Sequence, residues 1–272
     1  MRICNLGSGS RGNVTYIESN EAKILVDCGL SAREIEFRLF TIGINADEID
    51  AIFITHEHND HINGLKQFVK KHKCDVFMHY LNLEAVLEKQ DIDRVRANCF
   101  KLEDFLFKDI LVCPFELSHD SVYCVGYAFC SDGQKVSIAT DTGFMPNDAI
   151  DKMMDSDVIY IESNHNELLL LKNESYTAYL KKRILSSRGH LSYIDCAEAI
   201  YKLAQGCTYQ FVLSHLSEKN NTPRIAFEEV VSRLSKLGIV EGKDIFIDIA
   251  NQDKVGTMFE IKSKENANAT VV

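Results

Sequence analysis

The feature that most constrains this chain is a dense group of metal-binding side chains that follows an apolar run. Residues 51–54, Ala-Ile-Phe-Ile, precede the stretch 55–61, Thr-His-Glu-His-Asn-Asp-His, and residues 62–69 repeat their apolar positions with a helical period. This order predicts a buried strand, then a loop that carries ligands, then a helix. A single surface histidine is usually just solvated, but three histidines and an aspartate at this spacing are rare by chance. The stretch therefore predicts a metal site.

The spacing within this stretch divides the ligands between two ions. Side chains two residues apart on an extended segment point the same way, so His56 and His58 can bind one metal ion. Asp60 and His61 lie on the following turn, from which they can reach a second ion. A site with two metals needs about six or seven protein ligands, so further ligands are expected elsewhere in the chain.

Three other residues share the placement of these histidines, at the point where an apolar run breaks into a loop. They are His119, Asp141 and His215. Each alone would more often be structural, but their common placement makes them candidates for the remaining ligands. Asp141 is the best candidate to bridge two cations, because bridging uses both oxygens of one carboxylate.

The composition is that of an acidic globular chain. Of 272 residues, 46% are hydrophobic and 26% are charged, and the formal net charge is −10. This charge argues against coating of nucleic acid by general attraction, although a local basic groove is compatible with it. No membrane span or signal peptide is expected. The nine cysteines are scattered without a Cys-x-x-Cys pair, which is typical of reduced thiols in a cytoplasmic protein.

Apolar periodicity alternates along the whole chain. Strands are predicted at residues 2–6, 14–19, 23–28, 51–54, 76–78, 98–101, 105–107, 110–116, 122–130, 134–140, 157–161, 209–213, 244–248 and 255–261. Helices are predicted at about 31–40, 62–72, 82–89, 147–153, 175–186, 192–205 and 223–237. Two blocks, each of strands and then helices, predict two sheets packed face to face with helices outside. We expect one domain over 1–263 and a flexible tail at 264–272.

The order of the candidate ligands resembles the five-motif signature of the metallo-β-lactamase superfamily. The resemblance covers nearly the whole chain and rests on His56, His58, Asp60, His61, His119, Asp141 and His215. It implies an αββα sandwich of the α/β (α+β) class, with two mixed sheets flanked by helices and a dinuclear site at one edge. Mixed histidine and carboxylate ligands without cysteine suit zinc, manganese or iron.

A segment outside the ligand motifs narrows the subgroup. His190 directly precedes a predicted helix, and His215 opens a His-x-Ser after the next strand. This succession is similar to that of RNase Z-type phosphodiesterases, and by that resemblance His190 would donate a proton to the leaving oxygen. The competing interpretation is a solvated histidine beside a helix cap. The interval from Asp141 to His215 is too short for the domain that RNase J-type enzymes insert there.

Four segments look like the YycJ/WalJ group of small proteins with this fold: residues 7–13, 162–165, 187–192 and 213–221. That group is regarded as nuclease-like, so the resemblance implies nucleic acid, and DNA in particular, as the substrate. A tRNA-processing role is disfavoured, because no long Gly/Pro-rich arm is apparent. The oligomeric state is left open.

Phosphate binding requires cations or N–H donors near the metals. The candidates are Arg11 and Asn13 in the Gly/Ser-rich loop, together with Arg188 and the basic run 181–183. The lysines of that run are equally typical of a solvated helix face. His165 follows the strand 157–161 and is expected to line the site at the same edge.

The chemistry leaves four functions to compare. Two cations would lower the pKa of a shared water, and the resulting hydroxide would attack phosphorus or a carbonyl carbon while Asp60 orients it. A phosphodiesterase, most of all a DNA exonuclease, is favoured by His190. The alternative is a hydrolase of a thioester, lactone or cyclic phosphodiester. An oxidoreductase is disfavoured, because His58 stands where flavodiiron proteins carry Glu. A non-enzymatic member is disfavoured, because all seven ligands are present.

Overall fold

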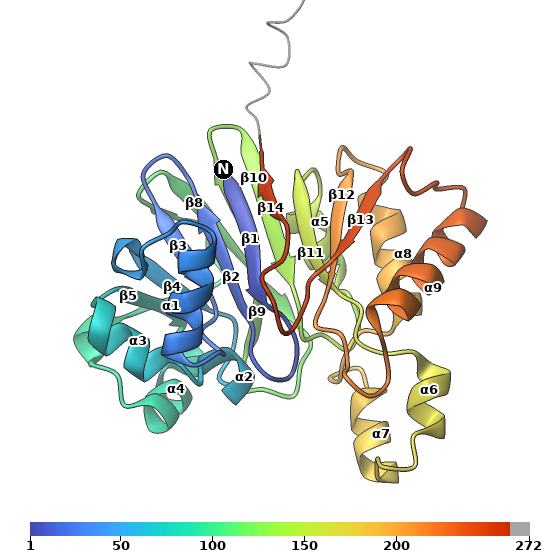
Figure 1. The fold of residues 1–272 in the computed structure, drawn as a ribbon, viewed down its shortest axis with the longest axis horizontal. Coiled ribbons are helices and arrows are strands. Elements are labelled where there is room, and N and C mark those ends of the chain that lie inside the picture. Colours follow the sequence, from blue (N-terminus) through green and yellow to red (C-terminus); the bar gives the residue numbers. More distant parts are fainter. Residues whose placement is uncertain (262–272) are drawn as a thin grey trace, which may run out of the picture.

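The fold is a sandwich of two β-sheets with helices on its outer faces, as Figure 1 shows. The computed structural model describes residues 1–261, so the predicted tail at 264–272 and the predicted domain end at 263 lie outside the described residues. This architecture confirms the predicted αββα arrangement. Within the described residues, no helix combines the length and apolar character that crossing a bilayer requires.

Each sheet has seven strands in the described part of the chain. In spatial order, the first sheet consists of β14 (Met258–Glu260), β1 (Arg2–Gly7), β2 (Val14–Glu18), β3 (Lys23–Val26), β4 (Ala51–Ile54), β5 (Asp75–His79) and β6 (Ala97–Phe100). The second sheet consists, in the same sense, of β13 (Phe246–Ile249), β12 (Gln210–Ser214), β11 (Val158–Glu162), β10 (Gln134–Ala139), β9 (Cys124–Ser131), β8 (Ile110–Leu117) and β7 (Phe105–Phe107).

The helices divide between the two outer faces. The core beneath the first sheet includes residues of α1 (Ala32–Thr41), α3 (Leu65–His72) and α4 (Leu83–Gln90). The core beneath the second sheet includes residues of α5 (Asn147–Met153), α8 (Tyr193–Leu203) and α9 (Pro223–Lys236). The short α2 (Asn59–Ile62) lies in the metal-binding motif, whereas α6 (Glu167–Lys172) and α7 (Ala178–Ile184) project from the body at the bottom of Figure 1.

The central strands are continuous apolar runs because both of their faces are buried. In β4, Phe53 packs between the two sheets, while Ile52 and Ile54 pack under the helices of the first sheet. In β11, Tyr160 packs between the sheets and Ile159 packs under the helices of the second. Successive side chains of a strand point to opposite faces, so one run of residues contributes to two cores.

Two sequence-based expectations were wrong in detail. The helix predicted at 62–72 is interrupted, because α2 ends at Ile62 and α3 begins at Leu65. Gly64 lies at the break, where its N–H donates to the Cys28 carbonyl oxygen at 2.8 Å. A Cβ at this position would come within 2.0 Å of the Leu30 carbonyl oxygen. The helix α6 was not predicted, since its apolar residues are mostly exposed and lack helical periodicity.

The sequence predicted that each sheet is formed by one continuous block of the chain, and this was wrong for one strand. The late strand β14 belongs to the first sheet, where it pairs antiparallel with β1. The strands β3, β4 and β5 are parallel to one another, as are β10, β11, β12 and β13. Parallel strands share the edge at which they end, so the loops after these strands meet along the lower edge in Figure 1.

Candidate metal centre

The seven predicted ligands lie together where strands of both sheets end. Four belong to the loop after β4 and the start of α2, and one each follows β8, β10 and β12. Their ligand atoms lie within 4.8 Å of one another in four overlapping sets: His56, His58 and His119; His56, His61 and Asp141; Asp60, His61 and His215; and Asp141, Glu162, His190 and His215. The structure thus brings together every residue that the sequence assigned to the metals.

Asp141 lies between two of these sets. Its Oδ2 atom is 3.0 Å from His61 Nε2, and its Oδ1 atom is 3.8 Å from His119 Nε2 and 3.3 Å from His215 Nδ1. It therefore has one carboxylate oxygen near the His61 ring and the other near the His119 and His215 rings. The contacts with His61 and His119 put its two oxygens beside histidines of different ligand sets, as a carboxylate shared between two cations would require.

The distances between ligand atoms suit cations better than direct hydrogen bonds. Two atoms that are each about 2.1 Å from one tetrahedral ion lie about 3.4 Å apart. His119 Nε2 is 3.3 Å from His58 Nδ1, and Asp60 Oδ2 is 3.5 Å from His61 Nε2 and 3.6 Å from His215 Nε2. The residues present therefore fit divalent ions.

Three buried polar atoms in the cluster support the same conclusion. Within residues 1–261, His56 Nε2, His215 Nε2 and Asp141 Oδ2 form no hydrogen bond, although His61 Nε2 lies 3.0 Å from Asp141 Oδ2. Burying a polar atom without a partner is costly. A bound cation would supply the missing partner for all three atoms.

A buried carboxylate that the sequence analysis missed supports the ligands of the first sheet. Asp27 follows β3, and its Oδ2 atom lies 2.7 Å from His61 Nδ1. Thr55 donates its backbone N–H to Asp27 at 2.8 Å, and its hydroxyl lies 3.0 Å from His56 Nδ1. The Nδ1–H of His61 thus has a carboxylate partner, which leaves Nε2 for a metal. The only signal in the sequence was an aspartate near the end of the strand predicted at 23–28.

A second buried carboxylate supports the ligands of the second sheet. Glu162, the last residue of β11, accepts at Oε1 from His190 Nδ1 at 2.8 Å and from His215 Nδ1 at 2.9 Å. Its Oε2 accepts from the backbone N–H of Thr142 at 2.8 Å and of Leu191 at 3.2 Å. Burial alone would raise the pKa of Glu162, but the two imidazoles hold this pKa below its usual value. The sequence places Glu162 in a segment that resembles the YycJ/WalJ group but indicates no role for it.

Electrostatics separate the histidines into two groups. Burial lowers the pKa of His56, His58 and His119, so their rings are neutral and can offer a lone pair to a cation. Burial also acts on His61, but nearby carboxylates, with Asp27 the strongest, raise its pKa above the usual value. The cluster therefore combines neutral donors with a concentration of negative charge.

His190 lies at the wall of the cluster rather than inside it. Its side chain is 17% exposed, and Nδ1 lies 3.4 Å from Asp141 Oδ1 in addition to its bond with Glu162. Since Nδ1 is the atom that faces both carboxylates, Nε2 is the ring nitrogen left for a ligand in the pocket. This arrangement suits an oriented acid or base.

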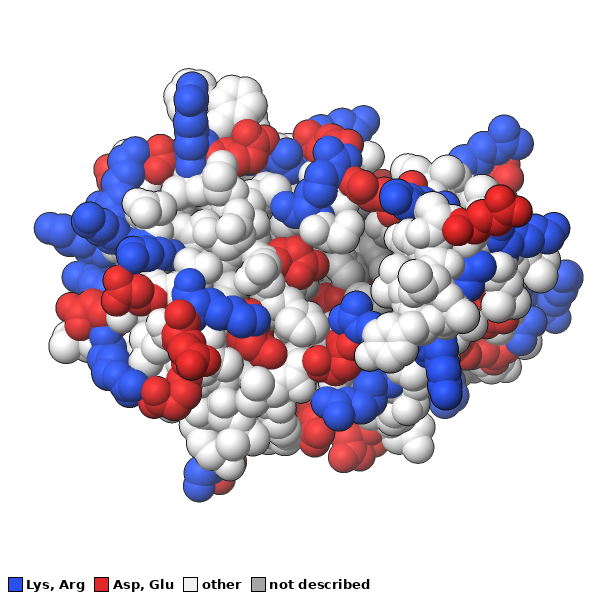
Figure 2. Space-filling view, turned by 90° about the horizontal axis from the view of Figure 1, so that it is seen from below, with Lys and Arg blue, Asp and Glu red and all other residues white. Residues whose placement is uncertain are grey.

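The cluster opens into a pocket of about 390 Å³. One wall comes from the α6–α7 projection through Tyr176, Leu180 and Arg183, and another comes from the loop after β12 through Ser217 and Lys219. Figure 2 views this edge from below and shows a hollow in the face, with Lys and Arg interspersed among Asp and Glu around it. The Lys219 ammonium lies 5.8 Å from the centroid of the Tyr176 ring. Cationic and aromatic groups therefore lie beside the metal ligands.

The two arginines predicted to bind substrate have protein partners. Arg11 is exposed, forms ion pairs with Glu218 and Asp253, and lines a neighbouring pocket rather than the one over the metal ligands. Arg188 donates to the backbone carbonyl oxygens of His119 at 3.0 Å and of Ser121 at 3.2 Å. Arg188 thereby fixes the loop that carries the predicted ligand His119.

The other two predicted substrate residues are buried. Asn13 accepts at Oδ1 from the backbone N–H of Gly9, and its Nδ2 donates to the Asp60 carbonyl oxygen at 3.3 Å and lies 3.0 Å from His61 Nε2. His165 is 1% exposed and lies outside the four ligand sets. Asn13 therefore contacts the ligand loop, whereas His165 does not reach the pocket lining.

The basic run 181–183 is divided between the pocket and the α6–α7 projection. Arg183 lines the pocket and forms an ion pair with Asp120. Lys181 donates to the Leu171 carbonyl oxygen at 2.6 Å and so ties α7 to the end of α6. Only Arg183 of this run lines the pocket in the described structure.

Comparisons with known proteins agree with this geometry. The model of the metallo-beta-lactamase superfamily matches residues 7–151. Exodeoxyribonuclease WalJ of Streptococcus pneumoniae serotype 2 (strain D39 / NCTC 7466) is 34% identical over 94% of this chain and 96% of that protein. Exodeoxyribonuclease YycJ of Bacillus anthracis is 32% identical over 88% of this chain and 90% of that protein. The crystal structure of the metallo-beta-lactamase fold protein YhfI from Bacillus subtilis superimposes with a TM-score of 0.72 at 16% identity, covering 95% of this chain and 99% of that one.

Proposed function

Because the chain belongs to the metallo-β-lactamase superfamily, in its WalJ and YycJ group, we propose that it is a metal-dependent phosphodiester hydrolase that acts on DNA as an exonuclease. The observation that carries the proposal is the pairing of His190 with buried Glu162 beside the metal ligands. Phosphodiester cleavage releases a poor leaving group, which needs a proton. Two relatives that match most of the chain and are named exodeoxyribonucleases support the choice of DNA.

We propose that the site holds two divalent ions. The first would be held by His56, His58 and His119, and the second by Asp60, His61 and His215, with Asp141 shared between them. The chemistry supplied by such ions is activation of a water molecule and neutralisation of charge on phosphate oxygens. The donor set suits zinc, manganese or iron, because it contains imidazoles and carboxylates without thiolates.

The protein's own groups divide the remaining tasks. Asp60 is 24% exposed and lines the pocket, so it can orient the attacking water as well as bind a metal. His190 would protonate the leaving oxygen from Nε2, while Glu162 acts as a positioning residue that fixes the ring. Lys219 from one wall of the pocket and Arg183, which is paired with Asp120, from another would contact phosphate oxygens. We propose a cytoplasmic enzyme, because all nine cysteines are free thiols.

The decisive experiment measures metal content and DNA cleavage on the same preparation. The purified chain is loaded with Zn²⁺ or Mn²⁺, and end-labelled single- and double-stranded DNA and RNA are digested. We expect about two ions per chain and DNA that shortens from one end. Protein that holds two ions and cleaves no nucleic acid would falsify the proposal.

Replacement of His190 tests the proposed proton donor. We expect His190→Ala to lower kcat on DNA by about 10²- to 10⁴-fold while both metals stay bound, because general acid catalysis contributes that much. The matched control is His72→Gln. His72 is the last residue of α3, where it pairs with Glu36 and Asp47 away from the pocket. Equal activity of His190→Ala and the wild-type protein would remove the proposed role.

One observation favours a second candidate, a hydrolase of small substrates such as a cyclic phosphodiester, a thioester or a lactone. The face around the pocket carries mixed charge instead of a continuous basic surface (Figure 2), and the formal net charge is −10. Rates on bis-p-nitrophenyl phosphate and on a thioester panel separate the candidates. Faster thioester hydrolysis without DNA cleavage would favour the second.

A further inference from the structure

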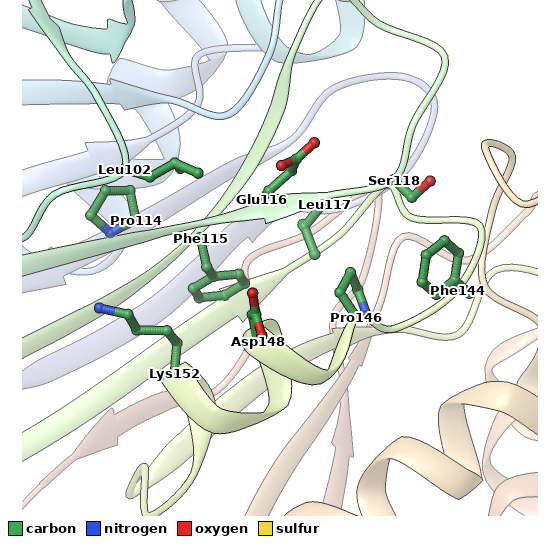
Figure 3. A pocket seen from close by; sticks show the side chains of 10 residues that line it. All are labelled: Leu102, Pro114, Phe115, Glu116, Leu117, Ser118, Phe144, Pro146, Asp148 and Lys152. Atoms are coloured by element: carbon green, nitrogen blue, oxygen red, sulfur yellow. The ribbon is translucent and has the colours of Figure 1, made fainter.

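A second groove, of about 410 Å³, lies beside the metal pocket between β8 and the start of α5. Its walls are mostly apolar and include Leu102, Pro114, Phe115, Leu117, Phe144 and Pro146. Figure 3 shows Phe115 and Leu117 pointing toward α5, with Phe144 and Ser118 at one end of the groove and Leu102 and Pro114 at the other. Neither the metal ligands nor His190 line this groove.

The end of the groove near Ser118 and Phe144 is formed by segments that also carry two of the proposed metal ligands, although the groove and the metal pocket share no lining residue. Ser118 precedes the proposed ligand His119, and consecutive Cα atoms are about 3.8 Å apart. Phe144 lies three residues after Asp141. The two segments are joined, because Gly143 donates its N–H to the Ser118 carbonyl oxygen at 2.8 Å. This end of the groove therefore lies on the same two loops as His119 and Asp141, within reach of a strand that extends from the metals.

Phe144 is the unusual member of this wall. Its side chain is 48% exposed, whereas Phe115 on the groove floor is 3% exposed. The Thr142 hydroxyl donates to the Phe144 carbonyl oxygen at 2.6 Å, which fixes the backbone of the loop that carries the ring. A large aromatic ring held at the mouth of an apolar groove offers a flat surface on which another ring can stack.

The charged side chains that line the groove disfavour binding of a phosphate and are compatible with an uncharged ring. Glu116 and Asp148 contribute two carboxylates, and the one ammonium, Lys152, forms an ion pair with Asp104 at 2.7 Å. A phosphate would meet net negative charge in this groove. An uncharged planar heterocycle would bury its faces against the phenylalanine and proline rings, and its amino groups could donate to the carboxylates.

We propose that this groove binds one nucleobase of the DNA strand, next to the phosphodiester that is cleaved, with the base stacked on Phe144. The proposal rests on the proposed function, because it requires DNA at the metals. It assigns the sugar–phosphate backbone to the metal pocket and the neighbouring base to the groove. Stacking of a base on an aromatic side chain is typically worth about 5- to 150-fold in affinity.

The test combines a protein variant with a modified substrate. Phe144→Ala is expected to raise KM for a single-stranded oligonucleotide about 10-fold with kcat nearly unchanged, and Phe144→Tyr is expected to behave like the wild-type protein. The matched control is Phe246→Ala, since Phe246 has the same 48% exposure but lies on β13, away from the groove. Because the Phe144 ring is exposed, the variants should fold as the wild-type protein does, and circular dichroism checks this.

An abasic nucleotide placed at successive positions of the oligonucleotide identifies the base that enters the groove. At one position beside the cleaved bond, we expect the abasic substitution to slow the wild-type protein about 10-fold and to have no further effect on Phe144→Ala. Equal KM values for Phe144→Ala and the wild-type protein would overturn the inference while leaving the nuclease function intact. A wild-type protein that cleaves no DNA would overturn both.

Discussion

The two sheets contribute to the metal centre in different ways. The first sheet provides four of the proposed ligands from the single segment after β4 that ends in α2, whereas the second provides three from three loops, after β8, β10 and β12. Each sheet also places one buried carboxylate behind its histidines, Asp27 in the first and Glu162 in the second. One half of the site is therefore local in sequence, and the other exists only once β8 to β12 are assembled.

The backbone shows a similar difference among the proposed ligands, although Asp27 behind the first sheet's histidines also has a positive φ of 62°. Asp141 and His215 have positive φ angles of 64° and 53°, whereas no residue of the loop 55–61 has a positive φ. A left-handed conformation costs a non-glycine residue on the order of 1–3 kcal/mol, so it must be held by its surroundings. His215 is held by a bond from its N–H to the Ser8 hydroxyl and by a bond from Asn164 Nδ2 to its carbonyl oxygen, both at 2.8 Å.

The largest effect is expected from replacing Asp141, which lies between the proposed ligands of the first sheet and those of the second. We expect Asp141→Asn to lower DNA cleavage by more than about 100-fold, the upper end of what loss of an outer partner causes. The metal content should fall below two ions per chain, because an amide nitrogen, which cannot bind a cation, replaces the carboxylate oxygen on the side of one ion. Metal analysis and cleavage rates measure both effects. Retention of two ions with full activity would contradict the shared position of Asp141.

Metal removal should affect both halves through stability. Ions at about 1,000 times their dissociation constant stabilise a protein by about 4 kcal/mol, which corresponds to a Tm change on the order of 10 °C for a chain of this size. We therefore expect a chelator to lower Tm by about that amount, and added Zn²⁺ or Mn²⁺ to restore it. Differential scanning fluorimetry makes the measurement. A Tm that is independent of the chelator would mean that the site does not hold metal in the folded protein.

The two buried carboxylates should differ in what they control. Asp27 contacts one site histidine, the proposed ligand His61. Asp27→Asn is therefore expected to weaken metal binding about 10- to 100-fold, and kcat should recover at saturating metal. Glu162 also contacts His190, so Glu162→Gln is expected to lower kcat even when both ions are bound. Titration with metal, followed by kcat at saturation, separates the two. If both variants recover fully, Glu162 does not position His190.

The smallest effects concern the residues proposed to contact substrate. Arg11 is exposed and already paired with Glu218 and Asp253, so Arg11→Ala should change kcat/KM on DNA by less than about twofold. Lys219 lines the pocket, and Lys219→Ala should lower kcat/KM about 10-fold through the loss of one charged hydrogen bond. The opposite ranking of these two variants would restore the sequence-based assignment of Arg11.

The difference between the halves also explains what the sequence could predict. The four proposed ligands after β4 could be predicted from the sequence, because they follow one buried strand at fixed spacing. Asp141 and His215 were identified because each ends a strand that is apolar on both faces. Asp27 and Glu162 occupy the same kind of position, but their roles depend on which ring lies opposite, and that is set by the packing of neighbouring strands.

Substrate contacts were the least predictable part. Arg188 was assigned to phosphate from its place in the chain, yet its guanidinium donates to the His119 and Ser121 carbonyl oxygens. A long side chain can satisfy its donors on the nearest backbone oxygens, and no sequence pattern reports that choice. The pairing of β14 with β1 was missed for a similar reason, since it joins segments more than 250 residues apart.

The pairing of β14 with β1 has a consequence for the order of events during synthesis. The residues that complete the outer side of β1, Met258 to Glu260, are translated after nearly all the rest of the described chain. At about 5–20 residues per second, β1 waits on the order of 10–50 s for this partner. During that time its outer N–H and C=O groups form an open edge that another nascent chain could pair with. Synthesis of β14 is therefore also the step that protects this sheet from pairing with other chains.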